Sequence, residues 1–460
     1  MLPDYVSMAK PNPLENRAPW YKNTAPTYAG IFLWFVFWNK MASGGTDTPG
    51  GVLGQGLGTA ILGLIVAALL CHFLFYLVPG LFGMKTGLPL YVVGTSTYGV
   101  QGGFLMPGFL MGVLQFGWLG VNSYFSSLAL APLFGGSQAA QIIIAIVWAA
   151  VAAFVGLKGI QYVAKVATFL PLIPLVILVI MIAKTIGGIG GFEAEKLVAA
   201  GAAEGSEAIG LSFFGVIALC ITYVVGFFAT AGAAGVDFGM NNKDEKNVQM
   251  GGLIGIALAA IIAGGAAILI AAGAFGASGK YGLITADVDF MSRVMGSPGA
   301  GKTFGLLLAV AAFPPACFSS FIAANSFKTT LPKVNPFISV GVGTAVSILL
   351  AVTGWAGDVE SVFFVIGAAF GPVCGAMMVD YLLSGKKWAG PRAGWNLAGW
   401  ISWVVGFIVG MAPLVGLANI PAAPLVAFFV GAVLYFILAK AGLESKVVEM
   451  TAAAAETPSE

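Results

Sequence analysis

Long apolar stretches constrain the fold of this chain more than any other feature. Stretches of roughly 20 apolar residues, the length that crosses the hydrocarbon core of a bilayer, can be placed twelve times. The predicted spans are residues 28–45, 56–82, 104–131, 138–156, 162–186, 211–238, 248–275, 303–326, 336–355, 359–383, 395–417 and 424–439. Only 9% of the residues are charged, which excludes a soluble protein. We therefore predict an all-α membrane protein with twelve transmembrane helices.

The basic residues predict the orientation of these helices. If the N-terminus lies inside, 15 of the 21 Lys and Arg residues fall in cytoplasmic segments, five fall outside, and Lys40 lies within the first span. Cytoplasmic loops are enriched in basic residues, and residues 1–27 lack the apolar core of a signal peptide. We expect a multi-pass protein of the cell membrane with both termini in the cytoplasm.

Two of the predicted spans are interrupted by glycine at matching positions. The interruptions are MASGGT at 41–46 in the first span and TAGAAG at 230–235 in the sixth. Non-helical backbone at membrane depth persists only where it lines a cavity, and paired broken helices indicate a transported ligand near the midplane. Five crossings separate the two spans, so two five-helix halves would be related as an inverted repeat.

This pattern divides the chain into segments. We predict a cytosolic N-terminal segment at 1–27, a first five-helix repeat at 28–186, an external loop at 187–210, a second repeat at 211–383 with an external cap helix near 283–295, two additional helices at 384–441 and a cytosolic tail at 442–460.

The third span carries side chains suited to holding a planar heterocycle. Gln115, Trp118 and Asn122 lie on one helix face, and they combine an indole ring for stacking with amides that can bind ring edges. Phe227 and Phe228, just before the second interruption, could form the opposite wall. The alternative is that any one of these aromatic side chains faces lipid.

An ion site would have to use uncharged oxygen ligands. Acidic residues are nearly absent from the middle of the spans, which argues against a carboxylate proton relay. Backbone carbonyls and the hydroxyls of Ser319 and Ser320 could hold sodium, although ordinary helix packing explains such a serine pair equally well. Asn325 needs a partner if it is buried in the membrane.

Two further polar residues have open roles. Lys40, beside Asn39, either snorkels to the interface, replaces a cation at the ion site, or contacts a carbonyl-bearing substrate. His72 is the only histidine and lies in an apolar stretch, where a packing role is favoured over a proton relay. The four cysteines form neither a disulfide pattern nor a metal-binding pattern.

Several sequence blocks resemble the purine and cytosine permease type of nucleobase:cation symporter, which includes hydantoin permeases. The blocks are GMKTGL at 83–88, QFGWLG at 115–120, GP at 371–372 and DYLL at 380–383. The resemblance extends from Pro26 to the twelfth span. It implies a leucine-transporter-type 5+5 inverted repeat and cation-coupled uptake of a base-like heterocycle by alternating access.

The resemblance also implies roles for individual residues. Trp118 and Phe228 would sandwich the substrate ring, and Gln115, Asn122 and Asn325 would bind its edge, with Phe37 close by. The sodium ligands would be carbonyls of Leu33, Val36 and Ala316 and hydroxyls of Ser319 and Ser320. A three-residue shift of the alignment would instead bring Asn39 and Lys40 into the site.

We therefore predict a monomeric symporter for a purine, pyrimidine or hydantoin, with sodium as the expected coupling ion, no other cofactor and no nucleic-acid partner. The alternative is a proton-coupled or uncoupled permease or channel for a small neutral solute. An enzyme is not expected, because the sequence offers neither paired catalytic carboxylates nor a Ser-His arrangement.

Overall fold

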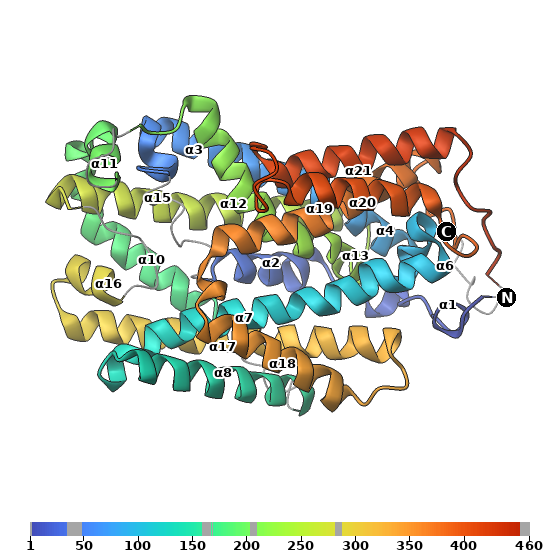
Figure 1. Ribbon diagram of the computed structural model, residues 1–460, viewed down its shortest axis with the longest axis horizontal. Helices are drawn as coiled ribbons and strands as arrows, with labels where there is room; N and C mark the ends of the chain where they lie inside the picture. Colours follow the sequence, from blue (N-terminus) through green and yellow to red (C-terminus); the bar gives the residue numbers. More distant parts are fainter. Residues whose placement is uncertain are drawn as a thin grey trace.

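The computed structural model describes residues 2–34, 48–158, 167, 169–202, 209–280 and 288–450. Long helices run side by side along the longest axis of the molecule (Figure 1). The described residues contain no β-strand, only two isolated bridges. The first glycine interruption, together with Val36, Phe37, Asn39 and Lys40, lies outside the described residues.

The helices of the first half follow the predicted order of spans. They are α1 (Asp4–Ser7), α2 (Thr24–Phe32), α3 (Gly56–Leu70), α4 (Leu77–Thr86), α5 (Leu90–Val93), α6 (Thr95–Gly103), α7 (Leu110–Leu130), α8 (Gln138–Lys158), α10 (Leu172–Thr185) and α11 (Ala194–Gly201). A π-helical segment, η5 (Cys71–Tyr76), joins α3 to α4, and a second, η6 (Phe104–Phe109), joins α6 to α7.

The second half repeats this pattern and adds two helices. It contains α12 (Phe213–Ala233), α13 (Gly235–Gly239), α14 (Glu245–Gly252), α15 (Ala259–Ser278), α16 (Val288–Met295), α17 (Pro298–Thr330), α18 (Pro336–Val352), α19 (Val359–Leu383), α20 (Leu397–Met411) and α21 (Ala423–Lys440). The π-helical segment η9 (Leu253–Leu258) joins α14 to α15, as η5 joins α3 to α4.

The predicted number of crossings is not confirmed. Eight described helical segments are long and apolar enough to span a membrane, and a ninth span is formed if Thr95–Gly103 and Met106–Phe134, which meet at 79°, count as one. Helices α18 and α20 coincide with the predicted ninth and eleventh spans, but they are shorter, with 17 and 15 residues. The predicted first span is described only as far as Trp34.

Helix contacts in the first half have counterparts in the second half. Helix α7 packs against α18, and its counterpart α17 packs against α8. In the same way, η5 contacts α12 while η9 contacts α2. Each pair becomes the other when the first and second halves are interchanged, as an inverted repeat requires.

Helix α1 and the segment that follows α21 lie at the same end of the molecule, whereas α11 and α16 lie at the opposite end (Figure 1). The N-terminal segment packs against the helix bundle through Arg17, which donates to the carbonyls of Asn12 and Met84. Tyr5 donates to the carbonyl of Val100, and the amide of Val100 donates to the carbonyl of Arg392. Described residues from both ends of the chain therefore meet around α6.

Candidate functional site

The second glycine interruption ends one helix and begins another. Helix α12 ends at Ala233, and α13 begins at Gly235. The hydroxyl of Tyr28 in α2 donates to the carbonyl of Ala231 at 2.9 Å, and the indole Nε1 of Trp118 in α7 donates to the hydroxyl of Thr230 at 3.3 Å. The interruption is thus tied to the first and third spans by groups that satisfy its polar atoms, as irregular structure inside a membrane requires.

The glycines of this interruption are also needed for close packing. A Cβ atom on Gly232 would lie 2.8 Å from Cβ of Phe75, and one on Gly235 would lie 2.9 Å from the ring of Tyr76. Small residues let membrane helices approach closely. The glycines therefore allow the broken helix to pack directly on the π-helical segment η5.

Trp118 lies in a cluster of aromatic rings at this interruption. Its ring centroid is 5.3 Å from that of Phe227 and 5.7 Å from that of Trp34, both in edge-to-face geometry. Phe363 of α19 completes the cluster, 5.5 Å from Phe227 and 6.2 Å from Trp118. We call Trp34, Trp118, Phe227 and Phe363 the aromatic cluster; Trp118 is its partly exposed member.

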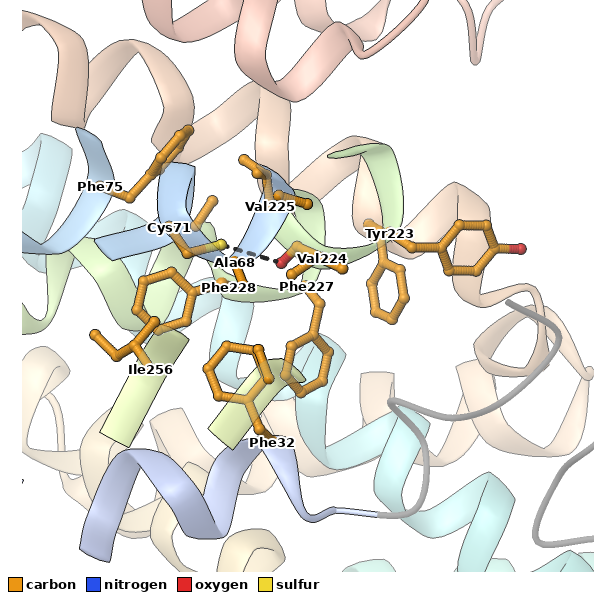
Figure 2. Close-up of a cluster of buried hydrophobic side chains, with 14 of the residues drawn as sticks. Phe32, Ala68, Cys71, Phe75, Tyr223, Val224, Val225, Phe227, Phe228 and Ile256 are labelled. Atoms are coloured by element: carbon orange, nitrogen blue, oxygen red, sulfur yellow. Dashed lines mark hydrogen bonds between the residues drawn. The ribbon is translucent and has the colours of Figure 1, made fainter. Parts of the chain in front are cut away.

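Phe228 lies against α2 (Figure 2). It is fully buried, and its ring stacks on Phe32 at 5.5 Å with an interplanar angle of 17°. Its second aromatic neighbour is Tyr28, at 5.6 Å. The ring of α12 that the structure places in direct contact with Trp118 is thus Phe227, and a sandwich between Trp118 and Phe228 stays a prediction.

The polar residues of the predicted substrate site have different surroundings. Gln115 is buried, and its Nε2 lies 3.5 Å from the sulfur of Met111. Asn122 is also buried, and both ends of its amide bind protein groups on α7, α8 and α17. The side chain of Asn325 is exposed. Their contact with a substrate remains a prediction.

The predicted sodium ligands of α17 lie in a helix that contains adjacent prolines. Pro314 and Pro315 carry no amide hydrogen, so the helix loses two backbone hydrogen bonds there. Ser319 and Ser320 follow within two turns and are buried, and Oγ of Ser320 has no hydrogen-bond partner. A buried hydroxyl without a partner is costly, and a bound cation would satisfy it. The donor set of α17 therefore fits sodium.

The remaining predicted ligands belong to the first span and to α17. Leu33 is the C-cap residue of α2 and is nearly buried; the last carbonyls of a helix lack partners within it. Ala316 is fully buried. Val36 lies outside the described residues, so the geometry of the complete ligand set stays a prediction.

Four residues at the site were not predicted from the sequence. Tyr28 and Thr230 satisfy polar atoms at the interruption, and Trp34 and Phe363 complete the aromatic cluster. Thr230 and Trp34 could have been suspected because they lie close to the glycine interruptions. Phe363 has no such local signal, since only the packing of α19 on α12 brings it there.

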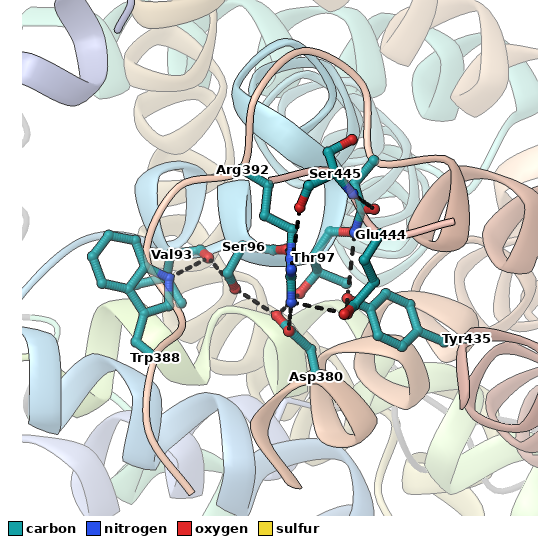
Figure 3. Close-up of polar contacts among 10 residues, drawn as sticks. Val93, Ser96, Thr97, Asp380, Trp388, Arg392, Tyr435, Glu444 and Ser445 are labelled. Carbon is teal, nitrogen blue, oxygen red and sulfur yellow. Dashed lines mark hydrogen bonds and ion pairs between the residues drawn. The ribbon is translucent and has the colours of Figure 1, made fainter. Parts of the chain in front are cut away.

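A second polar region is formed by residues that are far apart in the sequence (Figure 3). Arg392 pairs with Asp380 at 3.1 Å and with Glu444 at 2.8 Å, and its Nε donates to the carbonyl of Ser96. The hydroxyls of Ser96 and Thr97 donate to the second oxygen of Asp380. We call these five residues the Arg392 cluster.

The Arg392 cluster joins the loop before α20 to α6, α19 and the segment after α21. Burial lowers the pKa of Arg392, but the nearby carboxylates of Asp380 and Glu444 raise it by more, so its pKa lies above the ordinary value. The guanidinium therefore stays charged. A neighbouring contact, Lys85 Nζ to the hydroxyl of Tyr381 at 2.9 Å, brings together two of the sequence blocks that carry the family resemblance.

Comparison with known proteins shows the fold. No protein-family model and no curated protein matches the sequence. Among solved structures, the inward-facing conformation of Mhp1 matches with a TM-score of 0.67 and 17% identity, covering 95% of each chain. The chain therefore has the fold of the leucine-transporter type, in agreement with the predicted 5+5 inverted repeat.

Two further structures share this fold. Mhp1, described as a nucleobase-cation-symport-1 family transporter, in a closed conformation with bromovinylhydantoin bound, matches with a TM-score of 0.65 at 16% identity, covering 95% of this chain and 96% of the other. A Na⁺-coupled sialic acid symporter in a substrate-bound, outward-open state matches with a TM-score of 0.59 at 14% identity, covering 97% and 93%.

Proposed function

We propose that the protein is a nucleobase:cation symporter of the purine and cytosine permease type, which takes up a planar heterocycle together with sodium by alternating access. The observation that carries this proposal is the interrupted sixth span, held by Trp118 and Tyr28 beside the aromatic cluster. The shared fold with Mhp1 supports it. A transporter, rather than an enzyme, is the class in which such an interruption has a role.

The substrate would bind against Trp118, the partly exposed member of the aromatic cluster. Stacking on an indole stabilises a planar ring by about 0.5–1.5 kcal/mol beyond the burial of apolar area. Gln115 and Asn325 would contact the ring edge, and Phe37 and Asn39 would approach from the first span. Phe227 or Phe228 would provide the second aromatic wall.

Sodium would be held between the first and eighth spans by Leu33, Val36, Ala316, Ser319 and Ser320. The unpartnered hydroxyl of Ser320 supports this placement. A cation bound there would hold α17 to α2, and a ring bound at Trp118 would hold α7 to α12. Binding of both ligands would therefore favour one arrangement of these helices, which is the basis of coupled transport.

We further propose that the protein lies in the cell membrane as a monomer with both termini in the cytoplasm. The positions of α1 and of the segment after α21 at one end of the molecule support a common location of the termini (Figure 1). The excess of Lys and Arg in the segments predicted to lie on the same side of the membrane as the N-terminus supports a cytoplasmic location.

The test is a thermal-shift screen of the purified protein with purines, pyrimidines and hydantoins, in sodium chloride or choline chloride. A ligand that binds the folded state raises the melting temperature by mass action. We expect one class of compound to stabilise the protein and sodium to increase that effect. Equal stabilisation in both salts would instead support the proton-coupled or uncoupled alternative.

Uptake into proteoliposomes then separates a symporter from a channel. We expect accumulation of the radiolabelled compound above its external concentration when sodium flows inward, and collapse of that accumulation when the sodium gradient is dissipated. Failure of every tested heterocycle in both assays would contradict the proposed function.

A further inference from the structure

Asn122 joins three helices through its side-chain amide. Its Nδ2 donates to the carbonyl of Ala312 in α17 at 2.9 Å. Its Oδ1 accepts a hydrogen bond from Nε1 of Trp148 in α8 at 2.9 Å and another from the hydroxyl of Ser126 in α7 at 3.3 Å. The side chain is 1% exposed. Both polar atoms of the amide are therefore occupied by the protein.

The point of attachment on α17 lies close to two adjacent prolines. Ala312 directly precedes Phe313, Pro314 and Pro315, and the two prolines remove two hydrogen bonds from the helix. Trp148, which donates to Asn122, also packs its ring edge-to-face on Phe313 at 5.3 Å. We call the three hydrogen bonds of the Asn122 side chain the joint; it holds α17 within the turn that lacks these two backbone hydrogen bonds.

The two sides of the joint carry different parts of the proposed site. Trp118 lies one helical turn before Asn122 on α7, whereas Ala316, Ser319 and Ser320 lie one to two turns beyond Ala312 on α17. The joint is therefore the described hydrogen-bonded link between the helix that carries the indole and the segment that carries the unpartnered hydroxyl of Ser320.

We propose that Asn122 is a positioning residue that sets the sodium ligands of α17 relative to Trp118, and that it does so without contacting the substrate. This inference rests on the proposed function. A substrate-binding role would require Asn122 to give up its buried hydrogen bond to Ala312 or its partly buried hydrogen bond from Trp148. The proposal therefore predicts that Asn122 affects the binding of sodium and not the binding of the substrate.

The test uses three single substitutions in the joint. Asn122→Ala removes the amide, Trp148→Phe removes the Nε1 donor while keeping a ring against Phe313, and Ser126→Ala removes only the longer bond and serves as the matched control. Each purified variant is titrated with sodium chloride at constant chloride, with choline as the replacement cation, and its melting temperature is recorded.

We expect the sodium concentration that gives half of the stabilisation to rise about fivefold to tenfold in Asn122→Ala, because this substitution removes the bond to Ala312 and both bonds accepted by Oδ1. Trp148→Phe should raise it about threefold, because one of two acceptor interactions is lost. Ser126→Ala should leave it unchanged. Affinity for the compound found in the screen, measured at saturating sodium, should stay within about threefold of the wild-type value.

Hydrogen exchange without sodium provides a second readout. Peptides covering residues 310–325 should exchange faster in Asn122→Ala than in the wild-type protein. Peptides from α15 should exchange at the same rate, because the hydrogen bonds of Asn122 link α7, α8 and α17. If Asn122→Ala does not fold, Trp148→Phe carries the same comparison.

The outcomes separate the two proposals. An unchanged sodium dependence in Asn122→Ala, or a weaker compound affinity with normal sodium dependence, would overturn the positioning role and return Asn122 to the substrate site. A wild-type protein that shows no sodium effect, while a heterocycle still stabilises it, would instead refute sodium coupling in the proposed function and the positioning role with it.

Discussion

The Arg392 cluster and the aromatic cluster stabilise the same bundle by different means. In the Arg392 cluster, a buried guanidinium and a buried carboxylate are both paired, and two hydroxyls complete the bonding of Asp380. In the aromatic cluster, four rings from four parts of the chain meet mainly edge-to-face, and Trp118 donates a hydrogen bond to Thr230.

This difference indicates which region can change shape. A charged network loses several hydrogen bonds when its partners separate, so it holds one geometry. Aromatic contacts are less directional, and rings can shift while keeping most of their buried area. We infer that the Arg392 cluster holds one end of the bundle together while the aromatic cluster adapts to a ligand.

The largest effect is expected from Arg392→Ala. It leaves Asp380 as a buried, unpaired charge, which typically costs about 3–5 kcal/mol of folding free energy. Thermal unfolding in detergent, followed by size-exclusion chromatography, should show this loss. Arg293→Ala, at an exposed arginine of α16, is the matched control and should change the stability by less than about 0.5 kcal/mol.

Adding Asp380→Asn to Arg392→Ala should recover part of the lost stability, because it removes the unpaired charge. If Arg392→Ala were as stable as the Arg293→Ala control, the Arg392 cluster would not hold the helices as we infer.

Trp118→Ala should have the next largest effect, on affinity more than on folding. Loss of stacking and of buried ring area amounts to about 3 kcal/mol, or about a hundredfold in affinity for the compound found in the screen. Trp355→Ala provides the matched control, since Trp355 is 75% exposed and lies outside the aromatic cluster. Equal compound affinity of the two variants would place the substrate elsewhere.

Gly239→Ala tests the close packing of the broken helix. A Cβ atom there would lie 2.0 Å from the carbonyl oxygen of Gly80, so α13 and α4 would have to separate, at a cost of about 1–3 kcal/mol. The control is Gly341→Ala in α18, where no atom lies within 4 Å of the added Cβ; it should be neutral or stabilising by up to about 1 kcal/mol. Comparable melting temperatures for both variants would contradict the role of Gly239.

Ser320→Ala should have the smallest effect on folding. Because its hydroxyl has no protein partner, stability without sodium should change by less than about 0.5 kcal/mol, whereas stabilisation by sodium should be largely lost. Ser347→Ala should show the opposite pattern: its hydroxyl donates to the carbonyl of Phe116 at 2.7 Å, so about 1 kcal/mol of stability is lost and the sodium response is kept. A normal sodium response in Ser320→Ala would remove Ser320 from the ion site.

Much of the fold was predictable because its signals are local. The apolar stretches predicted most of the helices, and the glycines at 230–235 predicted the end of α12. The count of twelve crossings was not confirmed, because α18 and α20 are short, one span depends on a bent pair of helices, and the first span is described only as far as Trp34. Phe227 contacts Trp118 directly, whereas the role of Phe227 or Phe228 as the opposite wall of a substrate site stays a prediction.

The partners of individual polar atoms were not predictable. Asn122 donates to a carbonyl 190 positions away in the sequence. Arg392 pairs with Asp380 and Glu444, and no sequence motif links these three residues. A sequence motif states which groups are available for bonding, whereas the packing of helices decides which of them are used.

The sequence by itself determined the membrane setting, the order of the helices and the position of the second interruption, because the transfer of apolar residues into lipid and the backbone freedom of glycine act over one or a few turns. Only the tertiary structure decided that Phe227 contacts Trp118, that Asn122 donates a hydrogen bond to α17 close to its prolines, and that Oγ of Ser320 is left without a partner. These outcomes depend on distances of a few ångströms between helices that are far apart in the chain.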